Sequence, residues 1–135
     1  NVMVNILKDS LKSVSKDLKG AKVGVLGIAM KDYSNDDRIS PPIEIVNLLI
    51  EAGAQVEAFD PAVPTNYDYK VDSLDTVLNG KDAIIVLAKQ KEFDSISADE
   101  IKNGLNKDAV IFDTRNLFAG IKSELKEANI VYTTI

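Results

Sequence analysis

Residues 23–42 read VGVLGIAMKDYSNDDRISPP, and this stretch contains the parts from which an open α/β sheet builds a ligand site. Its first six residues are apolar and predict a buried strand, which a polar loop follows. The loop ends at Ser40-Pro41-Pro42, which is typical of the start of a helix. Ligands of open α/β sheets bind at the carboxyl ends of strands. Because the loop also contains the cations Lys31 and Arg38, the stretch indicates an anionic ligand, with phosphate as the first candidate.

The composition excludes several classes of function. The 135 residues suffice for one domain, and their net charge of -5 disfavours a general nucleic-acid or membrane surface. Cysteine and histidine are absent, which excludes disulfides, thiol nucleophiles, imidazole bases and Cys/His metal sites, so we expect no metal. With no apolar run of membrane-spanning length, no signal peptide and no cysteine, we expect a cytoplasmic protein. The first residue is Asn1 rather than Met, so we expect a piece of a longer protein.

Helix and strand patterns alternate along the whole chain. A narrow apolar stripe predicts a leading helix over 1–19 that ends at Gly20 and that either packs on its own domain or reaches another domain or subunit. The predicted strands are 22–28, 55–61, 82–88, 108–114 and 129–135. The later helices are predicted over 42–52, 73–80 and 117–128, and a further helix before residue 108 is predicted to begin at a cap, Ser97 or Asp99. In helix 42–52 we expect four residues to face the core, namely Ile43, Val46, Leu49 and Ile50.

This alternation predicts a Rossmann-like three-layer α/β/α domain with a parallel sheet of about five strands, preceded by one helix. We predict the strand order 3-2-1-4-5, which places the topological switch point beside the first strand. The loops 29–40 and 114–116 then meet over one crevice. That arrangement brings Lys31, Arg38 and Arg115 within reach of one ligand.

A dinucleotide is the obvious ligand of such a fold, but the sequence does not fit one. The G-x-G-x-x-G pattern fails from Gly24, which is followed by Leu26 and Ala29, and from Gly27, which is followed by Ala29 and Asp32. A phosphoacceptor receiver domain fits no better, because its acidic cluster should stand directly at the end of the first strand.

The helix start also argues against a phosphate held by backbone amides. Pro41 and Pro42 have no N–H group, and we expect the Ser40 hydroxyl to accept the N–H of Ile43. A phosphate here would therefore need side-chain cations. Asp60 stands where a ribose-binding acid would stand, although an aspartate before proline is also ordinary turn chemistry, which we favour.

The loop closely resembles the C-terminal, UDP-binding domain of the UDP-glucose/GDP-mannose dehydrogenase family. The residues that carry the resemblance are Gly27-Ile28-Ala29-Met30-Lys31 and then Asp36-Asp37-Arg38-Ile39-Ser40-Pro41. Further matches are Glu51-Ala52-Gly53-Ala54, Phe59-Asp60-Pro61 and Asp113-Thr114-Arg115-Asn116, so the resemblance covers essentially the whole chain.

The resemblance implies an NAD-dependent enzyme that oxidises the C6 alcohol of a UDP-sugar to a carboxylate in two steps. NAD and the catalytic cysteine would belong to parts of the protein outside these residues, so this chain alone should bind substrate without catalysis. Residues 1–20 would end an interdomain connecting helix, and residues 21–135 would form the UDP-sugar-binding domain. The expected partners are the UDP-sugar, the protein's own N-terminal NAD-binding domain and a second copy in a homodimer.

The resemblance also implies roles for single residues. Lys31 would reach the pyrophosphate, and Arg115 would reach the uridine diphosphate. Met30 replaces the family's usual aromatic residue, which leaves the backbone contact at that position in place. Arg38 would touch the substrate or hold the loop through Asp36 and Asp37, and we favour the second role.

The identity of the sugar depends on weaker signals. Asp113-Thr114-Arg115 slightly favours UDP-N-acetyl-D-mannosamine, and Asn116 favours UDP-glucose. Two alternatives stay open: a non-enzymatic nucleotide-sensing module with the leading helix as a dimer seam, and an NAD-binding domain that has lost its glycines.

Overall fold

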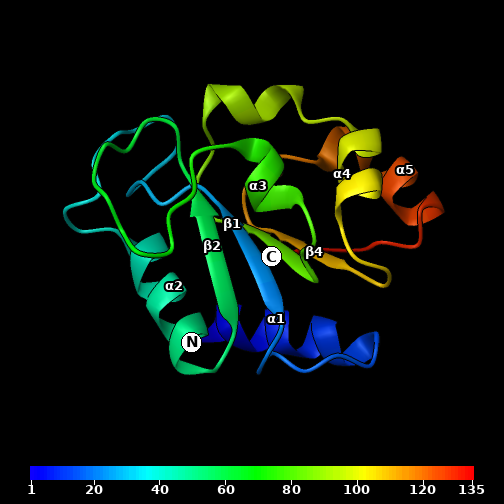
Figure 1. Cartoon of the computed structure of the whole chain (residues 1–135). Coiled ribbons are helices and arrows are strands. Elements are labelled where there is room, and N and C mark those ends of the chain that lie inside the picture. The colour runs from blue at the N-terminus through cyan, green and yellow to red at the C-terminus, as the bar shows by residue number, and fades with distance from the viewer.

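A five-stranded parallel sheet lies at the centre of the protein, for which we describe a computed structural model of all 135 residues (Figure 1). The strands are β1 (Lys22–Leu26), β2 (Gln55–Phe59), β3 (Ala83–Val86), β4 (Val110–Asp113) and β5 (Val131–Thr134). Each pairs with its neighbours in parallel. The predicted fold class, a Rossmann-like α/β domain with one leading helix, is confirmed.

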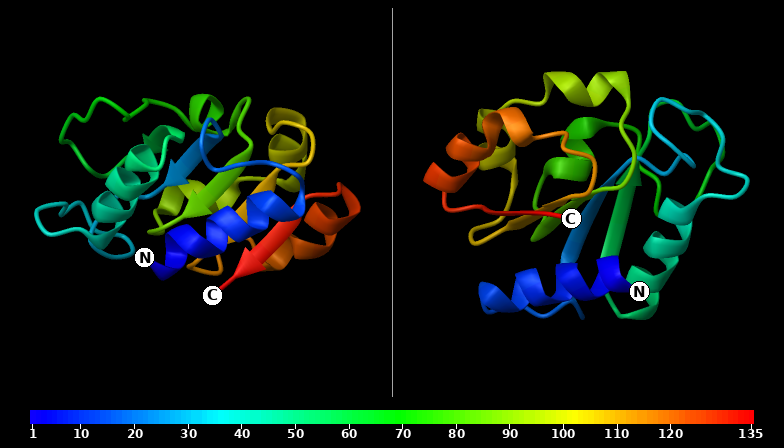
Figure 2. Two further views of the ribbon diagram at one scale, coloured as in Figure 1. Left: turned by 90° about the horizontal axis from the view of Figure 1, so that it is seen from below. Right: turned by 180° about the vertical axis from the view of Figure 1, so that it is seen from behind.

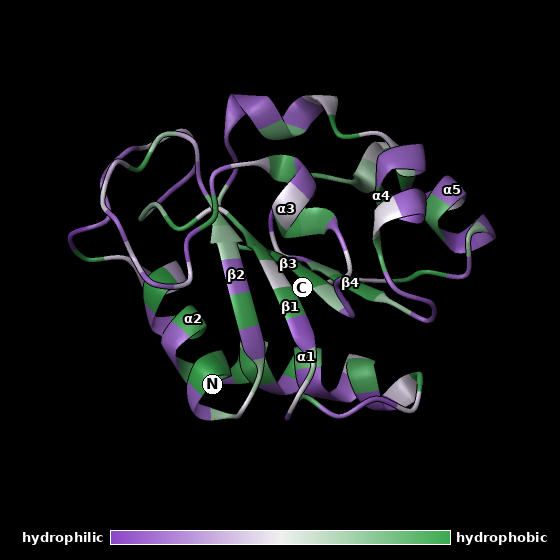
Figure 3. Cartoon of the chain, in the orientation of Figure 1, coloured by the Kyte–Doolittle hydropathy of each residue, from purple (hydrophilic) through white to green (hydrophobic).

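The predicted strand order is wrong. The sheet runs β2-β1-β3-β4-β5, so β3 lies between β1 and β4 instead of beyond β2. All four residues of β3 are apolar and buried, which requires neighbours along both edges and helices on both faces. In β2, Gln55 is exposed and Glu57 is half-buried, and the alternation of polar and apolar residues is visible in Figure 3. Such a strand fits an outer position, and the switch point therefore lies between β1 and β3.

Helices cover both faces of the sheet (Figures 1 and 2). On one face lie α1 (Val2–Ser13) and α2 (Pro41–Glu51), which share a cluster of 19 buried residues with the strands. On the other face lie α3 (Leu74–Leu78), α4 (Ala98–Gly104) and α5 (Lys122–Glu127), whose cluster has 12 buried residues. Two short 3₁₀ segments complete the chain, η1 (Lys91–Ser95) and η2 (Ala119–Ile121).

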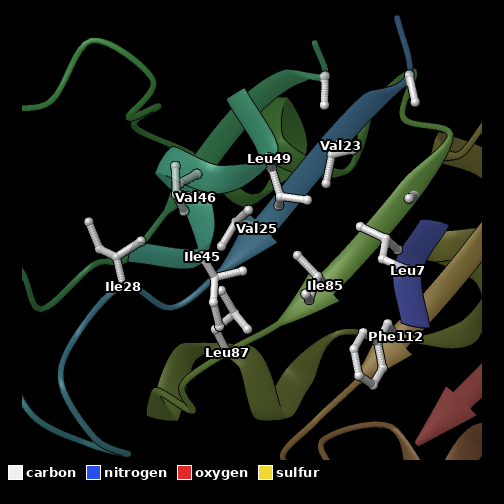
Figure 4. Close-up of a cluster of buried hydrophobic side chains, with 14 of the residues drawn as sticks. Leu7, Val23, Val25, Ile28, Ile45, Val46, Leu49, Ile85, Leu87 and Phe112 are labelled. Atoms are coloured by element: carbon white, nitrogen blue, oxygen red, sulfur yellow. The ribbon is translucent and has the colours of Figure 1, made fainter. Parts of the chain in front are cut away.

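The first of these clusters shows how the strand pattern determines the packing. Val23 and Val25 of β1 point to the same side of the sheet, because side chains along a strand alternate between its faces. There they meet α2, and Leu7 of α1 lies beside Ile85 and Phe112, which come from the central strand β3 and its neighbour β4 (Figure 4). Each of these side chains is completely buried.

Three details of the predicted helices need correction. The leading helix ends at Ser13, with its C-cap at Val14, and not at Gly20; Leu18 is nevertheless buried from the following turn. In α2, Val46 and Leu49 are buried as predicted, but Ile50 is 43% exposed and Ile45 is buried in its place. The helix predicted over 117–128 is a 3₁₀ turn followed by α5.

Of the two predicted caps for the helix after β3, Ser97 is confirmed. It caps α4 through a capping box with Glu100, whose side chain accepts the N–H of Ser97 in return. Ser73 likewise caps α3. None of the helices has the length and apolar character that a membrane span needs.

Candidate functional site

The chain leaves β1 at Gly27, directly at the switch point. Gly27 has φ +88°, and a Cβ atom there would lie 2.1 Å from the carbonyl oxygen of Ala88, which follows β3. Only glycine allows this close approach of two backbones together with a positive φ. The loops after β1 and β3 therefore begin in direct contact.

Asp60, at the end of β2, fixes the start of the loop after β1. Its carboxylate is buried, and one oxygen accepts the backbone N–H groups of Ile28 (2.9 Å) and Ala29 (3.1 Å). The other oxygen accepts the N–H of Ala62 at 3.0 Å, which confirms the predicted turn chemistry. Both carboxylate oxygens are thus committed to the protein backbone rather than presented to a ribose.

The start of α2 differs from the expectation in one respect. Pro41 and Pro42 occupy the first two helical positions, as predicted. The Ser40 hydroxyl, however, makes no capping bond to Ile43; it donates to the carbonyl of Ile28 at 2.6 Å. The loop is short enough for Ser40 to return to the end of β1, so the hydroxyl closes the base of the loop.

Arg115, which follows β4, is held at both ends. Its backbone N–H donates to a carboxylate oxygen of Asp113. Its guanidinium pairs with Asp32, with Nε 3.0 Å from Oδ1 and Nη2 2.7 Å from Oδ2. This paired arrangement leaves the Nη1 group without a protein partner. The predicted meeting of the loops after β1 and β4 therefore occurs, although β3 separates the two strands.

Asp32 joins three loops through this one carboxylate. Besides Arg115, it accepts the backbone N–H of Lys89 at 2.8 Å, and Tyr33 donates its own N–H to the carbonyl of Lys89. Partial burial alone would raise the pKa of Asp32, but the bonds from Arg115 and Lys89 outweigh it and hold the pKa below its ordinary value. Sequence reasoning missed Asp32, because its partners lie 57 and 83 residues away.

Asp113 explains the rigid turn that carries Arg115. Its side chain is completely buried and accepts the backbone N–H groups of Arg115, Leu117 and Phe118. It also accepts the hydroxyl of Tyr132 at 2.7 Å. Burial, together with this bond, raises the pKa of Tyr132. Asp113 is thus fully occupied by the protein, which leaves the guanidinium of Arg115 to Asp32.

Lys31 and Met30 lie at the exposed part of the loop after β1. The ammonium group of Lys31 has no hydrogen-bond or ion-pair partner in the protein, and Lys31 directly precedes the residue that Arg115 contacts. Met30 is 41% exposed, and its N–H donates to the carbonyl of Asp36 at 2.8 Å. Met30 can therefore offer a ligand its side chain or its carbonyl oxygen, but not its N–H.

Arg38 points into solvent and pairs with Asp36 on its own loop. Nε and Nη2 of Arg38 lie 3.0 and 2.8 Å from the two oxygens of Asp36. These bonds lower the pKa of Asp36 to about 2. The pairing agrees with the favoured role of Arg38 in holding the loop; a contact with substrate stays a prediction.

A second loop, residues 60–72, lies beside the first (Figures 1 and 2). The hydroxyl of Tyr67 donates to Asp37 at 2.5 Å, and the ring of Tyr67 stacks on Tyr69 with centroids 5.2 Å apart. The two loops share an open hollow of about 290 Å³ lined by Asn35, Asp36, Asp37, Arg38, Pro64 and Thr65.

The larger hollows of the protein lie away from this edge. One of about 590 Å³ is lined by residues of β2, α3 and α4 and contains the buried Lys81. The ammonium group of Lys81 already contacts Glu57 and the carbonyl oxygens of Thr76 and Asn79, which satisfies its three donors. Nowhere do three or more Asp or Glu residues form a cluster that could hold a metal ion. The loops after β1, β3 and β4 are therefore the best candidate for a ligand site.

Comparison with known proteins gives consistent matches. A family model described as "UDP-glucose/GDP-mannose dehydrogenase family, UDP binding domain" matches residues 24–120. The chain is 30% identical over 120 residues to a UDP-N-acetyl-D-mannosamine dehydrogenase of Methanococcus maripaludis, which covers 87% of this chain and 28% of that protein. It is 33% identical over 135 residues to a UDP-glucose 6-dehydrogenase of Bacillus subtilis, which covers 94% of this chain and 28% of that protein.

A solved structure agrees with these matches. The NDP-N-acetyl-D-galactosaminuronic acid dehydrogenase of Methanosarcina mazei superposes with a TM-score of 0.89 at 34% identity. The superposition covers 99% of this chain and 28% of that one. The chain thus spans less than a third of the length of each of these proteins.

Proposed function

Since the chain belongs to the UDP-glucose/GDP-mannose dehydrogenase family, by its match to the family's UDP binding domain, we propose that it binds the diphosphate of a UDP-sugar at the carboxyl edge of its sheet. The resemblance predicted from the loop sequence is confirmed. We propose further that the complete protein oxidises the C6 alcohol of the sugar to a carboxylate with NAD as the oxidant. Dimerisation and a cytoplasmic location stay predictions from the resemblance.

One observation supports the diphosphate site above all. The guanidinium of Arg115 reaches from the end of β4 to the loop after β1, where it meets the residue next to Lys31. Arg115 and Lys31 both have N–H donors that no protein group accepts. Charge-assisted hydrogen bonds to phosphate are among the stronger polar contacts, and arginine offers them in a planar fork while lysine acts as a point charge.

The residues of this chain do not fit NAD. The start of α2 lacks the glycine pattern, and its two prolines remove backbone donors that would hold a pyrophosphate. Asp60, in the position of a ribose-binding acid, has both oxygens bound to backbone amides. We therefore propose that NAD and the catalytic groups belong to another part of the protein, and that this chain binds and orients the substrate.

For the sugar, we propose UDP-N-acetyl-D-mannosamine in preference to UDP-glucose. The support is the sequence Asp113-Thr114-Arg115, which is more similar to the first branch of the family. The Thr114 hydroxyl donates to the carbonyl of Val86 and is therefore not free to contact the sugar. Thr114 supports this choice of sugar only through its similarity to that branch of the family.

Calorimetric titration of the 135-residue chain with UDP, the two UDP-sugars and NAD tests the proposal. We expect UDP and UDP-sugars to bind and NAD not to bind. A ligand at 100 times its dissociation constant stabilises the fold by about 2.7 kcal/mol, which a thermal shift detects independently. If NAD stabilises the chain and UDP does not, the proposal fails.

Substitution identifies the contact groups. Lys31→Ala and Arg115→Ala should each weaken UDP binding at least about tenfold, because a hydrogen bond to a charged group contributes about 1.5–3 kcal/mol. The matched control is Lys8→Ala, which removes an exposed lysine of α1 and should leave UDP affinity unchanged. Equal affinities in all three variants would contradict the site.

A further inference from the structure

We propose that Asp32 is a positioning residue that holds the guanidinium of Arg115 in place for the diphosphate of the ligand. The inference rests on the proposed function for the identity of the ligand. It goes beyond that function because it assigns a binding role to an acidic residue inside a site for an anion.

The geometry of the Asp32–Arg115 pair indicates that Asp32 orients the guanidinium and does not attract the ligand. Two parallel contacts, of 3.0 Å at Nε and 2.7 Å at Nη2, fix the plane of the guanidinium and the direction of its free Nη1 edge. The pair as a whole is neutral, so Asp32 adds no attraction for phosphate. Lys31, the neighbouring cation without a protein partner, supplies the uncompensated positive charge.

Asp32 is itself fixed and does not follow the arginine passively. Its Oδ1 atom also accepts the N–H of Lys89, so the carboxylate is tied to the loop after β3. Its side chain is 22% exposed, whereas that of Arg115 is 45% exposed. The better-buried partner thus determines where the more exposed one lies. The other end of Arg115 is held by Asp113 through the backbone.

The physical benefit is a smaller loss of entropy on binding. An arginine side chain has several rotatable bonds, and ordering one such side chain at a binding site reduces affinity by roughly 2- to 12-fold. Because Asp32 orders Arg115 before the ligand arrives, that loss is already incurred in folding. Removal of Asp32 should therefore weaken UDP binding by about that factor, even though it removes a negative charge from the site.

Two substitutions separate this role from ordering of the loops. Asp32→Asn keeps an oxygen that can accept the N–H of Lys89, but it cannot receive both contacts of the guanidinium. We expect it to weaken UDP binding about as much as Asp32→Ala does. Asp32→Glu keeps the carboxylate on a longer side chain and should restore part of the affinity.

The decisive experiment is a double-mutant cycle with Arg115→Ala, measured by titration with UDP. If Asp32 acts through Arg115, Asp32→Asn weakens binding in the wild-type background but does not weaken it in the Arg115→Ala background, where it removes an unpaired negative charge. Weakening by the same factor in both backgrounds, or tighter binding of Asp32→Asn in the wild-type background, would overturn the positioning role while UDP binding by the wild type still stands. Absence of UDP binding in the wild type would overturn the proposed function itself.

A measurement without ligand tests the pair directly. Nuclear magnetic resonance of the arginine Nε–H groups should show Arg115 as rigid in the wild type and mobile in Asp32→Asn. A mobile Arg115 Nε–H group in the wild type would overturn the inference whatever the affinities are.

Discussion

Replacement of Asp60 by asparagine should destabilise the protein through hydrogen bonds alone. Asparagine has nearly the same shape as aspartate, so the substitution leaves no cavity and its effect reports on hydrogen bonds. In the wild type, Asp60 accepts three backbone N–H groups, from Ile28, Ala29 and Ala62, within a buried environment.

The magnitude follows from the orientation that the amide must take. With its oxygen towards Ile28 and Ala29, the amide turns its NH₂ group to the N–H of Ala62, and that donor loses its partner at about 1–3 kcal/mol. The two remaining bonds lose their charge assistance, which is worth about 1 kcal/mol each. We therefore expect Asp60→Asn to lower the free energy of unfolding by about 3–5 kcal/mol. A domain of ordinary stability remains folded after such a loss.

Urea denaturation of the wild type and the variant measures this change. The slope m should be unchanged, because the substitution alters hydrogen bonds and not the surface exposed on unfolding. Asp9→Asn makes the same chemical change at an exposed position of α1 and should cost less than about 0.5 kcal/mol. A loss below about 1 kcal/mol in Asp60→Asn would refute the role assigned to the carboxylate. Asp60→Asn should also weaken UDP binding, because the Asp60 carboxylate holds the backbone just before Lys31 in place.

Two further predictions test the loops around the site. In chemical denaturation, Gly27→Ala should lower the free energy of unfolding by about 1–3 kcal/mol more than Gly20→Ala does. Both glycines have φ near +85°, but only a methyl group at position 27 meets the backbone of Ala88. Equal losses of stability in the two variants would contradict the close approach. Burial, and then the bond to Asp37, raise the pKa of Tyr67 to about 12. The folded state therefore binds the phenol proton of Tyr67 more tightly than the unfolded state does. The resulting stabilisation is present below pH 10 and is lost as the pH rises towards 12. Burial also raises the pKa values of Tyr69 and Tyr132, so ultraviolet titration should show several late-titrating phenols. Of these, Tyr67 should shift most to lower pH in Asp37→Asn; an unchanged titration would refute the bond.

The amino-acid sequence was sufficient for the elements and for the family. Uniformly apolar runs such as 83–88 and 109–112 can only be stable when buried on both faces, and this local requirement predicts a parallel sheet covered by helices. The prolines at 41 and 42 exclude an amide cradle wherever the helix lies, because the missing N–H groups are a property of the residue itself. The match to the family's UDP binding domain likewise follows from a contiguous stretch of sequence.

The tertiary structure alone decided how these elements come together. The position of β3 between β1 and β4 depends on pairing between strands far apart in the sequence; the alternating pattern of β2 fits an edge, but no local pattern specifies which strands are neighbours. Ser40 illustrates the same limit: its hydroxyl could bond locally at the helix start, but the folded chain brings the carbonyl of Ile28 within 2.6 Å. The pairing of Asp32 with Arg115 joins residues 83 positions apart. Each aspartate in the sequence offers the same chemistry to that arginine, and only the folded chain brings one of them to it.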